Sequence, residues 1–357
     1  MMARPWRVAA LVVGLILPMV ATATSSPSSP GWREALRQRL EALAADHPGE
    51  LGVYVKDMHS GETLSFRGDE VWYLASLIKV PVAIAVLREV ERGELALDST
   101  LRLEVADYVD GAGDTNWQPP GSELRIDFLL EQMLTASDNT AADMLMRHVG
   151  LVEINRLVQA LVPEGLGPIS TLIDVRHHVY RHLHPRAFEL DGMDFITLQK
   201  AADDRQRVET FRELLGLRRE ELQIEDLDSA FAAYYTSHLN AGWLSAYGRL
   251  LEALVEGRAL SADATAYLLA TMRRTTTGEA RLKAGLPSDV GLAHKTGTQH
   301  RRACDAGIAE RGRGAAARRV IIVACARGSL STPQSEALLA AVGAAVAASG
   351  VLEPDLR

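Results

Sequence analysis

Three short groups of polar residues stand out because together their side chains could carry out one acyl-transfer reaction. They are Ser76-Leu77-Ile78-Lys79, Ser137-Asp138-Asn139 and Lys295-Thr296-Gly297, the last followed by Thr298. A Ser and a Lys at one given spacing occur by chance about once in a chain of ordinary composition. The first group alone therefore also fits a serine at the start of a helix. All three groups, in this order along the chain, are a strong combination.

The first group predicts a nucleophile and its base. Ser76 and Lys79 are three residues apart, so both lie on one face if this segment is helical. A serine hydroxyl is a poor nucleophile unless a neighbouring base takes its proton. Lys79 can be that base only after its ammonium group has lost a proton, and burial or a nearby positive charge lowers a lysine pKa. We expect Lys295 to supply that positive charge.

The second group predicts a proton relay and a substrate contact. Ser137 offers a hydroxyl that can pass a proton between Lys79 and a leaving nitrogen. Asn139 offers an amide that can hold a substrate carbonyl. We expect Asp138 to be structural.

The third group predicts binding of a substrate carboxylate and of a developing negative charge. Lys295 can pair with a carboxylate and Thr296 can donate a hydrogen bond to it. Gly297 lets the backbone approach a substrate closely. The backbone N–H groups of Ser76 and Thr298 would then form an oxyanion hole.

These groups and the residues around them resemble the class A β-lactamase family, within the penicillin-recognising serine acyl-enzymes. Residues 134–146 (LTASDNTAADMLM) resemble the family's helix around its second motif, and residues 275–298 (TTTGEARLKAGLPSDVGLAHKTGT) resemble its approach to the third. Residues 72–75 lead into Ser76 in the family manner, and the likeness extends over about residues 33–350. The resemblance implies a serine acyl-enzyme mechanism on β-lactams or related acyl-peptides, with no cofactor and no metal.

One feature of class A enzymes is missing. The family carries a glutamate, in an E-x-x-L-N pattern, that activates the water releasing the acyl group, and the corresponding stretch here reads TLIDVRHHVYRHLHPR over residues 171–186. Asp174 is near the expected distance from Ser137, so we predict it as the water-activating base. Glu164 and Glu189 are alternatives, and Asp174 also fits a helix cap. Loss of one positioned base costs about 10²–10⁴ in rate, so slow deacylation is expected.

These residues lead to one function and two alternatives. The first is a class A β-lactamase-like serine hydrolase that opens a β-lactam amide through a Ser76 acyl-enzyme. The missing glutamate leaves open a cell-wall D-alanyl-D-alanine peptidase, that is, a penicillin-binding protein, or a non-catalytic binding homologue. The expected partner is a small β-lactam or a peptidoglycan-like acyl-peptide, and the expected state is a monomer.

The elements that must position these residues follow an order of helix, two strands, a long helical block, strands and helix. Apolar residues recur at helical spacing from Trp32 to Leu43 and alternate from Leu51 to Val55, as in a half-buried strand. Strands at both ends can share one sheet only if the helical block is inserted between them. We therefore predict an α+β fold (an α/β sandwich) of the β-lactamase/transpeptidase type. In it, an antiparallel sheet and flanking N- and C-terminal helices (32–70 and 273–352) carry an inserted all-α domain (71–272).

Histidines and cysteines near these groups raise two further questions. Four histidines between residues 177 and 184 include His178 and His182 at metal-ligand spacing, but we expect a polar, partly exposed helix or loop there and no metal site. His294 is expected to point away from Lys295 on a strand. Cys304 and Cys325 would face each other across a hairpin, as a disulfide or as two buried thiols.

Composition excludes some classes of protein, and the N-terminal sequence predicts where the protein works. The 357 residues carry a formal charge of −8, with 47% hydrophobic and 24% charged residues, which argues against a disordered chain and a dedicated nucleic-acid binder. Two arginines, an apolar run and Ala21-Thr22-Ala23 predict a signal peptide over 1–23, followed by a linker over 24–31. An uncleaved anchor is the alternative. We expect an exported protein, periplasmic or secreted, without a stable membrane span.

Overall fold

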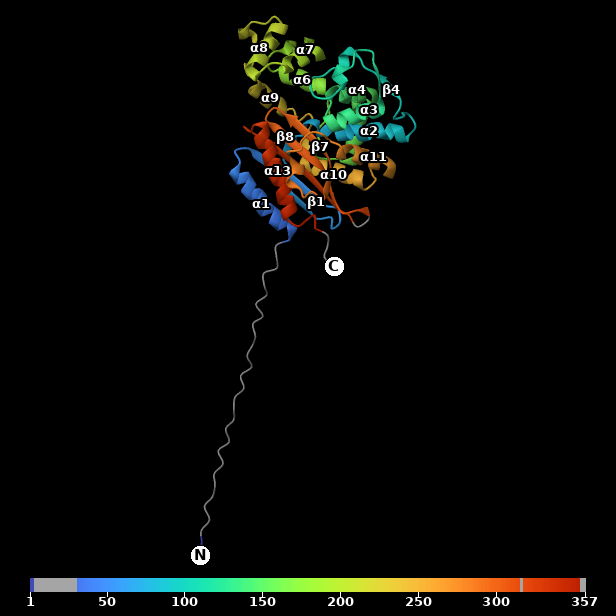
Figure 1. Ribbon diagram of the computed structural model, residues 1–357. Helices are drawn as coiled ribbons and strands as arrows, with labels where there is room; N and C mark the ends of the chain where they lie inside the picture. Colours follow the sequence, from blue (N-terminus) through green and yellow to red (C-terminus); the bar gives the residue numbers. More distant parts are fainter. Residues whose placement is uncertain (3–30, 315–316, 354–357) are drawn as a thin grey trace.

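The computed structural model describes residues 1–2, 31–314 and 317–353. The predicted signal peptide and nearly all of the predicted linker lie outside the described residues. Figure 1 shows a sheet covered by α1 and α13 at one end of the molecule and a group of helices that includes α6, α7 and α8 at the other.

A five-stranded antiparallel sheet in the order β2-β1-β9-β8-β7 forms the base of the fold. Its strands are β1 (Glu50–Asp57), β2 (Thr63–Phe66), β7 (Val290–Gln299), β8 (Arg302–Arg311) and β9 (Arg318–Arg327). Segments from the two ends of the described chain therefore pair directly, as the predicted order of elements requires. Two smaller two-stranded sheets join β3 (Val71–Tyr73) to β6 (Ala241–Trp243) and β4 (Thr100–Arg102) to β5 (Glu123–Arg125).

Both faces of this sheet are covered, which explains the unbroken apolar run in β9. Val320 and Ile322 pack into the cluster under α1 and α13, whereas Ile321 and Val323 pack into the larger cluster on the opposite face. The expectation of a half-buried strand at 51–55 is wrong. β1 is a central strand between β2 and β9, and helices cover both faces of the sheet there, so its side chains are buried on both sides.

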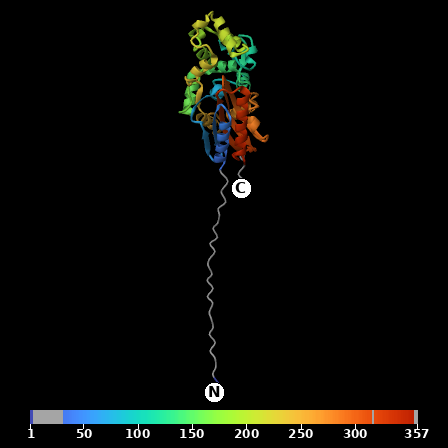
Figure 2. The ribbon, with the colours of Figure 1, turned by 90° about the vertical axis from the view of Figure 1, so that its left-hand side faces the viewer.

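Two terminal helices cover one face of the sheet. The helices α1 (Trp32–Asp46) and α13 (Thr332–Ala348) lie side by side, blue and red in Figures 1 and 2. Leu36 and Leu40 of α1 share a core cluster with Leu338 and Val342 of α13. The short α12 (Leu282–Gly285) packs against α13.

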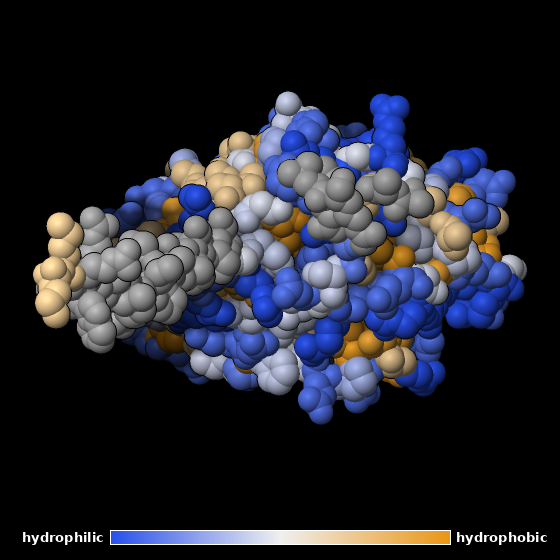
Figure 3. Space-filling view, turned by 90° about the horizontal axis from the view of Figure 1, so that it is seen from below, coloured by the Kyte–Doolittle hydropathy of each residue, from blue (hydrophilic) through white to orange (hydrophobic). Residues whose placement is uncertain are grey.

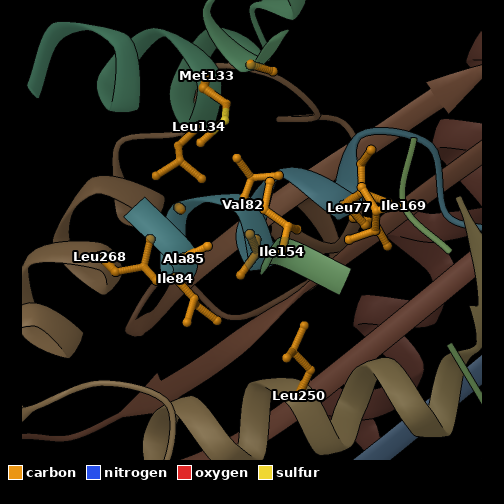
Figure 4. Packing of buried hydrophobic residues seen from close by; sticks show 14 of the residues in the cluster. Leu77, Val82, Ile84, Ala85, Met133, Leu134, Ile154, Ile169, Leu250 and Leu268 are labelled. Carbon is orange, nitrogen blue, oxygen red and sulfur yellow. The ribbon is translucent and has the colours of Figure 1, made fainter. Parts of the chain in front are cut away.

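The opposite face carries the largest core cluster, which surrounds α2 (Lys79–Glu91). Its helices are α2, α3 (Ile126–Glu131), α4 (Asn139–Val149), α5 (Leu151–Leu161), α10 (Leu244–Val255) and α11 (Ala262–Arg273). Figure 4 shows Val82 and Ile84 of α2 among Leu134, Ile154 and Leu250 from neighbouring elements. A helix buried on all sides is held rigidly, because closely packed interiors tolerate little displacement.

A third cluster belongs to the helices between α5 and β6. These are α6 (Leu172–Tyr180), α7 (Gly192–Gln199), α8 (Asp204–Leu214) and α9 (Leu227–Tyr235). Tyr73 and Ala75, which precede Ser76, are part of this cluster. The insertion therefore packs directly against the segment that carries the predicted nucleophile.

The fold class predicted from sequence is confirmed: an α+β protein with an antiparallel sheet, flanking terminal helices and a helical insertion. The proposed domain boundaries stay a prediction. Two helices inside the predicted insertion also touch the sheet, since α10 packs on β1 and β9 and α11 packs on β7.

The two cysteines form a disulfide between neighbouring strands. Cys304 of β8 and Cys325 of β9 are cross-strand partners with Cα atoms 4.1 Å apart. Of the two possibilities left open by the sequence, the structure therefore has the disulfide rather than free thiols.

The outer surface is mixed in polarity. The face in Figure 3 is mostly hydrophilic, with hydrophobic residues in separate patches. Within the described ranges, no helix combines the length and the apolar character that a membrane span requires.

Candidate active site

The predicted nucleophile lies where a strained turn enters α2. Ser76 is the second residue of a 3-10 helix, η1 (Ala75–Ile78), that runs directly into α2. Ala75 has φ of 49°, a left-handed conformation that costs energy for any residue with a Cβ atom. Tyr247 of α10 anchors the turn, since its hydroxyl donates to the Leu77 carbonyl over 2.9 Å. Ser76 itself is half-buried.

Lys79 connects the first and second polar groups. Its Nζ donates to the Ser137 carbonyl at 2.6 Å and to the Asn139 Oδ1 at 2.6 Å, and it lies 3.3 Å from the Ser137 Oγ. The Lys79 side chain is fully buried. That burial lowers its pKa to about 7, against the opposing charges of Asp138 and Asp143. A substantial fraction of Lys79 is therefore neutral near pH 7, as a base requires.

Two cations act on Lys79. The charge of Arg176 of α6 further lowers the pKa of Lys79, and Lys295 and Lys79 repel each other. Lys295 is itself fully buried, and burial together with the charge of Lys79 holds the pKa of Lys295 well below its usual value. Its Nζ donates to the Thr296 carbonyl at 2.9 Å.

The second group forms a sharp turn between two helical segments. Ser137 has φ of 64° and ψ of 33° and ends a π-helical turn, η4 (Gln132–Ala136). Asp138 then caps α4, with one oxygen accepting from the Ala141 N–H and the other from the Thr115 N–H. These contacts agree with the structural role expected for Asp138. Asn139 donates through Nδ2 to the Asp110 carbonyl at 2.6 Å.

The third group lies on β7, next to Ser76. A Cβ atom on Gly297 would lie 2.5 Å from the Leu74 carbonyl oxygen and 3.3 Å from the Ser76 nitrogen. Only glycine therefore allows this strand to approach the η1 turn so closely. Thr296 is buried and Thr298 is exposed at the surface.

Arg281 is a residue of the site that the sequence analysis did not single out. Its guanidinium group, 4% exposed, donates to the Gly297 carbonyl at 3.1 Å and to the Thr298 Oγ1 at 2.7 Å. It thereby holds the exposed end of the third group. The only sequence signal was its place in the stretch 275–298, and no spacing marked it.

Asp174 lies at the start of α6, apart from this group. Its Oδ2 accepts from the Thr171 Oγ1 at 2.5 Å, while its N–H donates back to the same hydroxyl. In the described chain it makes no hydrogen bond to Ser76, Lys79 or Ser137. The charge of Asp174 acts on Asp143, whose charge acts in turn on Lys79. The role of Asp174 stays a prediction.

The start of α6 is instead fixed by Asp143 of α4. This buried carboxylate accepts from the Leu172 N–H at 2.8 Å and from the Ile173 N–H at 2.9 Å. One turn further along, Arg176 pairs with Asp110 at 2.5 Å. Sequence analysis missed Asp110, Asp143 and Arg176, because each acts through a partner distant in sequence.

The histidines have packing roles. The His177 ring contacts Phe188 and Phe195 and hydrogen-bonds the Leu190 carbonyl at 2.9 Å. Among the described residues, no three His, Cys, Asp or Glu side chains gather as a metal ion would require. His294 is buried on β7, and its Nδ1 lies 2.7 Å from the Asp305 Oδ1.

Comparisons with known proteins agree with this geometry. A sequence model described as the beta-lactamase enzyme family matches residues 35–349. A β-lactamase of Streptomyces fradiae is 34% identical over 155 residues, which cover 42% of this chain and 50% of that protein. The β-lactamase VEB-1 of Pseudomonas aeruginosa is 22% identical over 74% of this chain and 71% of its own. The chain thus spans about half the length of the first of these relatives.

Solved structures show the same fold. A mutant of PBP-A in an acyl-enzyme complex with penicillin G aligns with a TM-score of 0.66 and 22% identity, over 90% of this chain and 98% of that one. A class A β-lactamase of Bacteroides cellulosilyticus aligns with a TM-score of 0.66 and 20% identity, over 90% of this chain and 99% of that one.

Proposed function

Because the chain belongs to the beta-lactamase enzyme family, we propose that it is a serine hydrolase that opens β-lactam amides through an acyl-enzyme on Ser76. The observation that carries this proposal is the buried Lys79 amine, held between the Ser137 and Asn139 side chains one helical turn from Ser76.

In the first step, the Ser76 Oγ attacks the β-lactam carbonyl carbon. Neutral Lys79 accepts the hydroxyl proton, so an Oγ–C bond forms and the carbonyl oxygen becomes an oxyanion. The backbone N–H groups of Ser76 and Thr298 are proposed to stabilise that charge.

Collapse of the oxyanion breaks the amide C–N bond. The proton passes from Lys79 through the Ser137 hydroxyl to the leaving nitrogen, a route supported by the 3.3 Å separation of the Lys79 Nζ and the Ser137 Oγ. The product is a ring-opened ester on Ser76. Water must then attack this ester to regenerate the hydroxyl.

Substrate binding is proposed to involve Asn139 and the third group. Asn139 would hold the acyl-side amide, and Lys295 with Thr296 would hold the substrate carboxylate. Burial disfavours the charged form of Lys295, and a bound carboxylate would favour it.

Release of the acyl group is proposed to be slow. The carboxylates whose charges act on Lys79 are Asp138 and Asp143. Each accepts backbone N–H bonds through both oxygens, so each is already engaged in holding the backbone in place. Asp174 as the water-activating base remains a proposal. If it is, Asp174→Ala should lengthen the lifetime of the acyl-enzyme about 100-fold or more, whereas an unchanged lifetime would remove Asp174 from that role.

The absence of the family's E-x-x-L-N glutamate also supports a second candidate, a D-alanyl-D-alanine peptidase of the penicillin-binding type. Such an enzyme would be labelled stably by penicillin and would release acyl groups from its own peptide substrates. Localisation outside the cytoplasm is proposed with either function, on the N-terminal sequence pattern alone.

Turnover of a chromogenic cephalosporin separates these candidates. We expect a burst of colour matching the enzyme concentration, followed by slow steady turnover, and neither phase in Ser76→Ala. Fast steady turnover would contradict slow deacylation. No burst and no turnover in the folded wild type would contradict the proposed hydrolase. A burst without any steady turnover, together with release of D-alanine from a D-alanyl-D-alanine peptide, would favour the peptidase.

A further inference from the structure

A polar cavity of about 190 Å³ lies between the inserted helices and the end of β7. Its polar lining residues are Asp110, Arg176, Tyr180, Gln199, Arg207 and Gln299. The cavity adjoins the proposed substrate site at two points, because the Asp110 carbonyl accepts from Asn139 and Gln299 directly follows Thr298. A group attached to an acyl carbonyl held between Asn139 and Thr298 can therefore extend into it.

Arg176 is the dominant charged group in this cavity. Its side chain is 14% exposed, and its Nε donates to the Asp110 carboxylate. Although burial alone would lower the pKa of Arg176, the Asp110 carboxylate raises it, so the guanidinium stays charged. Among the described residues, its Nε is paired, and neither of its two terminal amino groups donates a hydrogen bond. A buried guanidinium with unpaired N–H groups is a ready donor for a ligand.

The other charged lining group is a second cation. Arg207 donates to the Leu198 carbonyl at 3.2 Å and lies 3.4 Å from Asp204, which leaves further N–H groups unpaired. Asp110 is the single carboxylate of the lining, and it already accepts from Arg176. The amide oxygens of Gln199 and Gln299 are neutral acceptors. With two guanidinium groups and one carboxylate, the lining carries a net positive charge.

We infer that this cavity is a subsite for a carboxylate on the acyl side chain of the substrate, bound by the terminal amino groups of Arg176. The planar guanidinium presents two parallel N–H groups, which match the two oxygens of a carboxylate. The inference rests on the proposed function and deepens it. It names the preferred substrates as β-lactams or acyl-peptides with an anionic acyl side chain.

Benzylpenicillin and carbenicillin provide a matched test, since they differ by one carboxylate on the acyl side chain. The second-order rate constant of Ser76 acylation is measured for both by intact-mass spectrometry. Equilibrium binding of both to Ser76→Ala is measured by calorimetry. We expect the ratio of the carbenicillin value to the benzylpenicillin value, in acylation and in binding, to fall about ten-fold or more in Arg176→Gln. The fall should be smaller in Arg176→Lys, which keeps the positive charge but loses the two parallel N–H groups.

Arg205→Gln is the control, because it removes one positive charge from an exposed position on the same helix as Arg207 and should leave the ratio unchanged. The double variant Arg176→Gln/Asp110→Asn avoids leaving Asp110 without its partner, and it should show the same fall. An unchanged ratio in a folded Arg176 variant, in acylation and in binding, overturns the subsite.

The two proposals can fail separately. If neither penicillin acylates the wild type, the acyl-enzyme proposal fails. The subsite is then still decided by whether Ser76→Ala binds carbenicillin more tightly than benzylpenicillin, and by whether the added change Arg176→Gln removes that preference.

Discussion

Lys79 shows how burial creates a base from a residue that is normally charged. Taking an ammonium group out of water disfavours its charged form, and the fully buried Lys79 has a pKa lowered to about 7. Its two short hydrogen bonds to Ser137 and Asn139 hold the nitrogen in place. The chemistry proposed for Ser76 therefore depends on the packing around α2 as much as on the residues that react.

The acylation rate should follow the protonation of Lys79. The base acts when neutral, so the rate constant should rise about ten-fold per pH unit below pH 7 and level off above it. Burial also raises the pKa of Asp143 to about 7, so the profile reports one apparent value for the coupled groups. Acylation measured by rapid quench between pH 5 and 9 tests this. A flat profile would show that Lys79 is not the base, and a rate that still rises about ten-fold per pH unit at pH 9 would show that the pKa of the base is not lowered.

At the scale of elements, the site depends on how closely β7 approaches the η1 turn. A methyl group at Gly297 would collide with the Leu74 carbonyl oxygen, whereas one at Gly291 of the same strand meets no atom closer than 3.8 Å. We expect Gly297→Ala to slow acylation about 100-fold, because displacements of about 1 Å at a reacting centre cost this much. Gly291→Ala is the matched control. Equal acylation rates in the two variants would contradict the account.

The attachment of α6 to α4 predicts a stability difference between two aspartates. Asp143→Ala leaves two buried N–H groups without acceptors and should lower the free energy of unfolding by about 2–4 kcal/mol. Asp174→Ala removes one half-exposed hydrogen bond to Thr171 and should cost about 1 kcal/mol or less. Denaturant unfolding of both variants measures the difference. Similar losses would mean that Asp143 does not hold α6.

Elements and catalytic groups differ in how well the sequence predicts them. The helix at 32–46 follows from the apolar pattern of its sequence, and the Ser76 and Lys79 pair from local spacing. The Arg176 and Asp110 pair spans 66 positions of the chain and has no local pattern. Side chains that act through such long-range contacts are recognised only once the fold places them together.

At the scale of the whole molecule, the sheet joins segments from both ends of the described chain through the pairing of β1 with β9, and the disulfide cross-links β9 to β8. Cys304 and Cys325 enclose 21 positions of sequence on adjacent strands, and the Cys304 sulfur lies 3.5 Å from the Tyr73 carbonyl oxygen. The cross-link therefore lies just behind the segment that leads to Ser76.

Removing this disulfide should lower stability more than activity. A closed loop of this length stabilises a fold by about 3 kcal/mol in the chain-entropy account. The double variant Cys304→Ala/Cys325→Ala should lose about 2–3 kcal/mol in denaturant unfolding and keep its acylation rate within about three-fold. Unchanged stability would show that the bond is dispensable to the fold.

The most direct test of the account is a time course of intact-mass spectrometry after mixing the protein with benzylpenicillin, followed by peptide mapping. The account predicts one covalent adduct, placed on the peptide containing Ser76, absent from Ser76→Ala and lost slowly after free penicillin is removed. A folded wild-type protein that gains no adduct, or one that carries the adduct on another residue, would contradict the central claim.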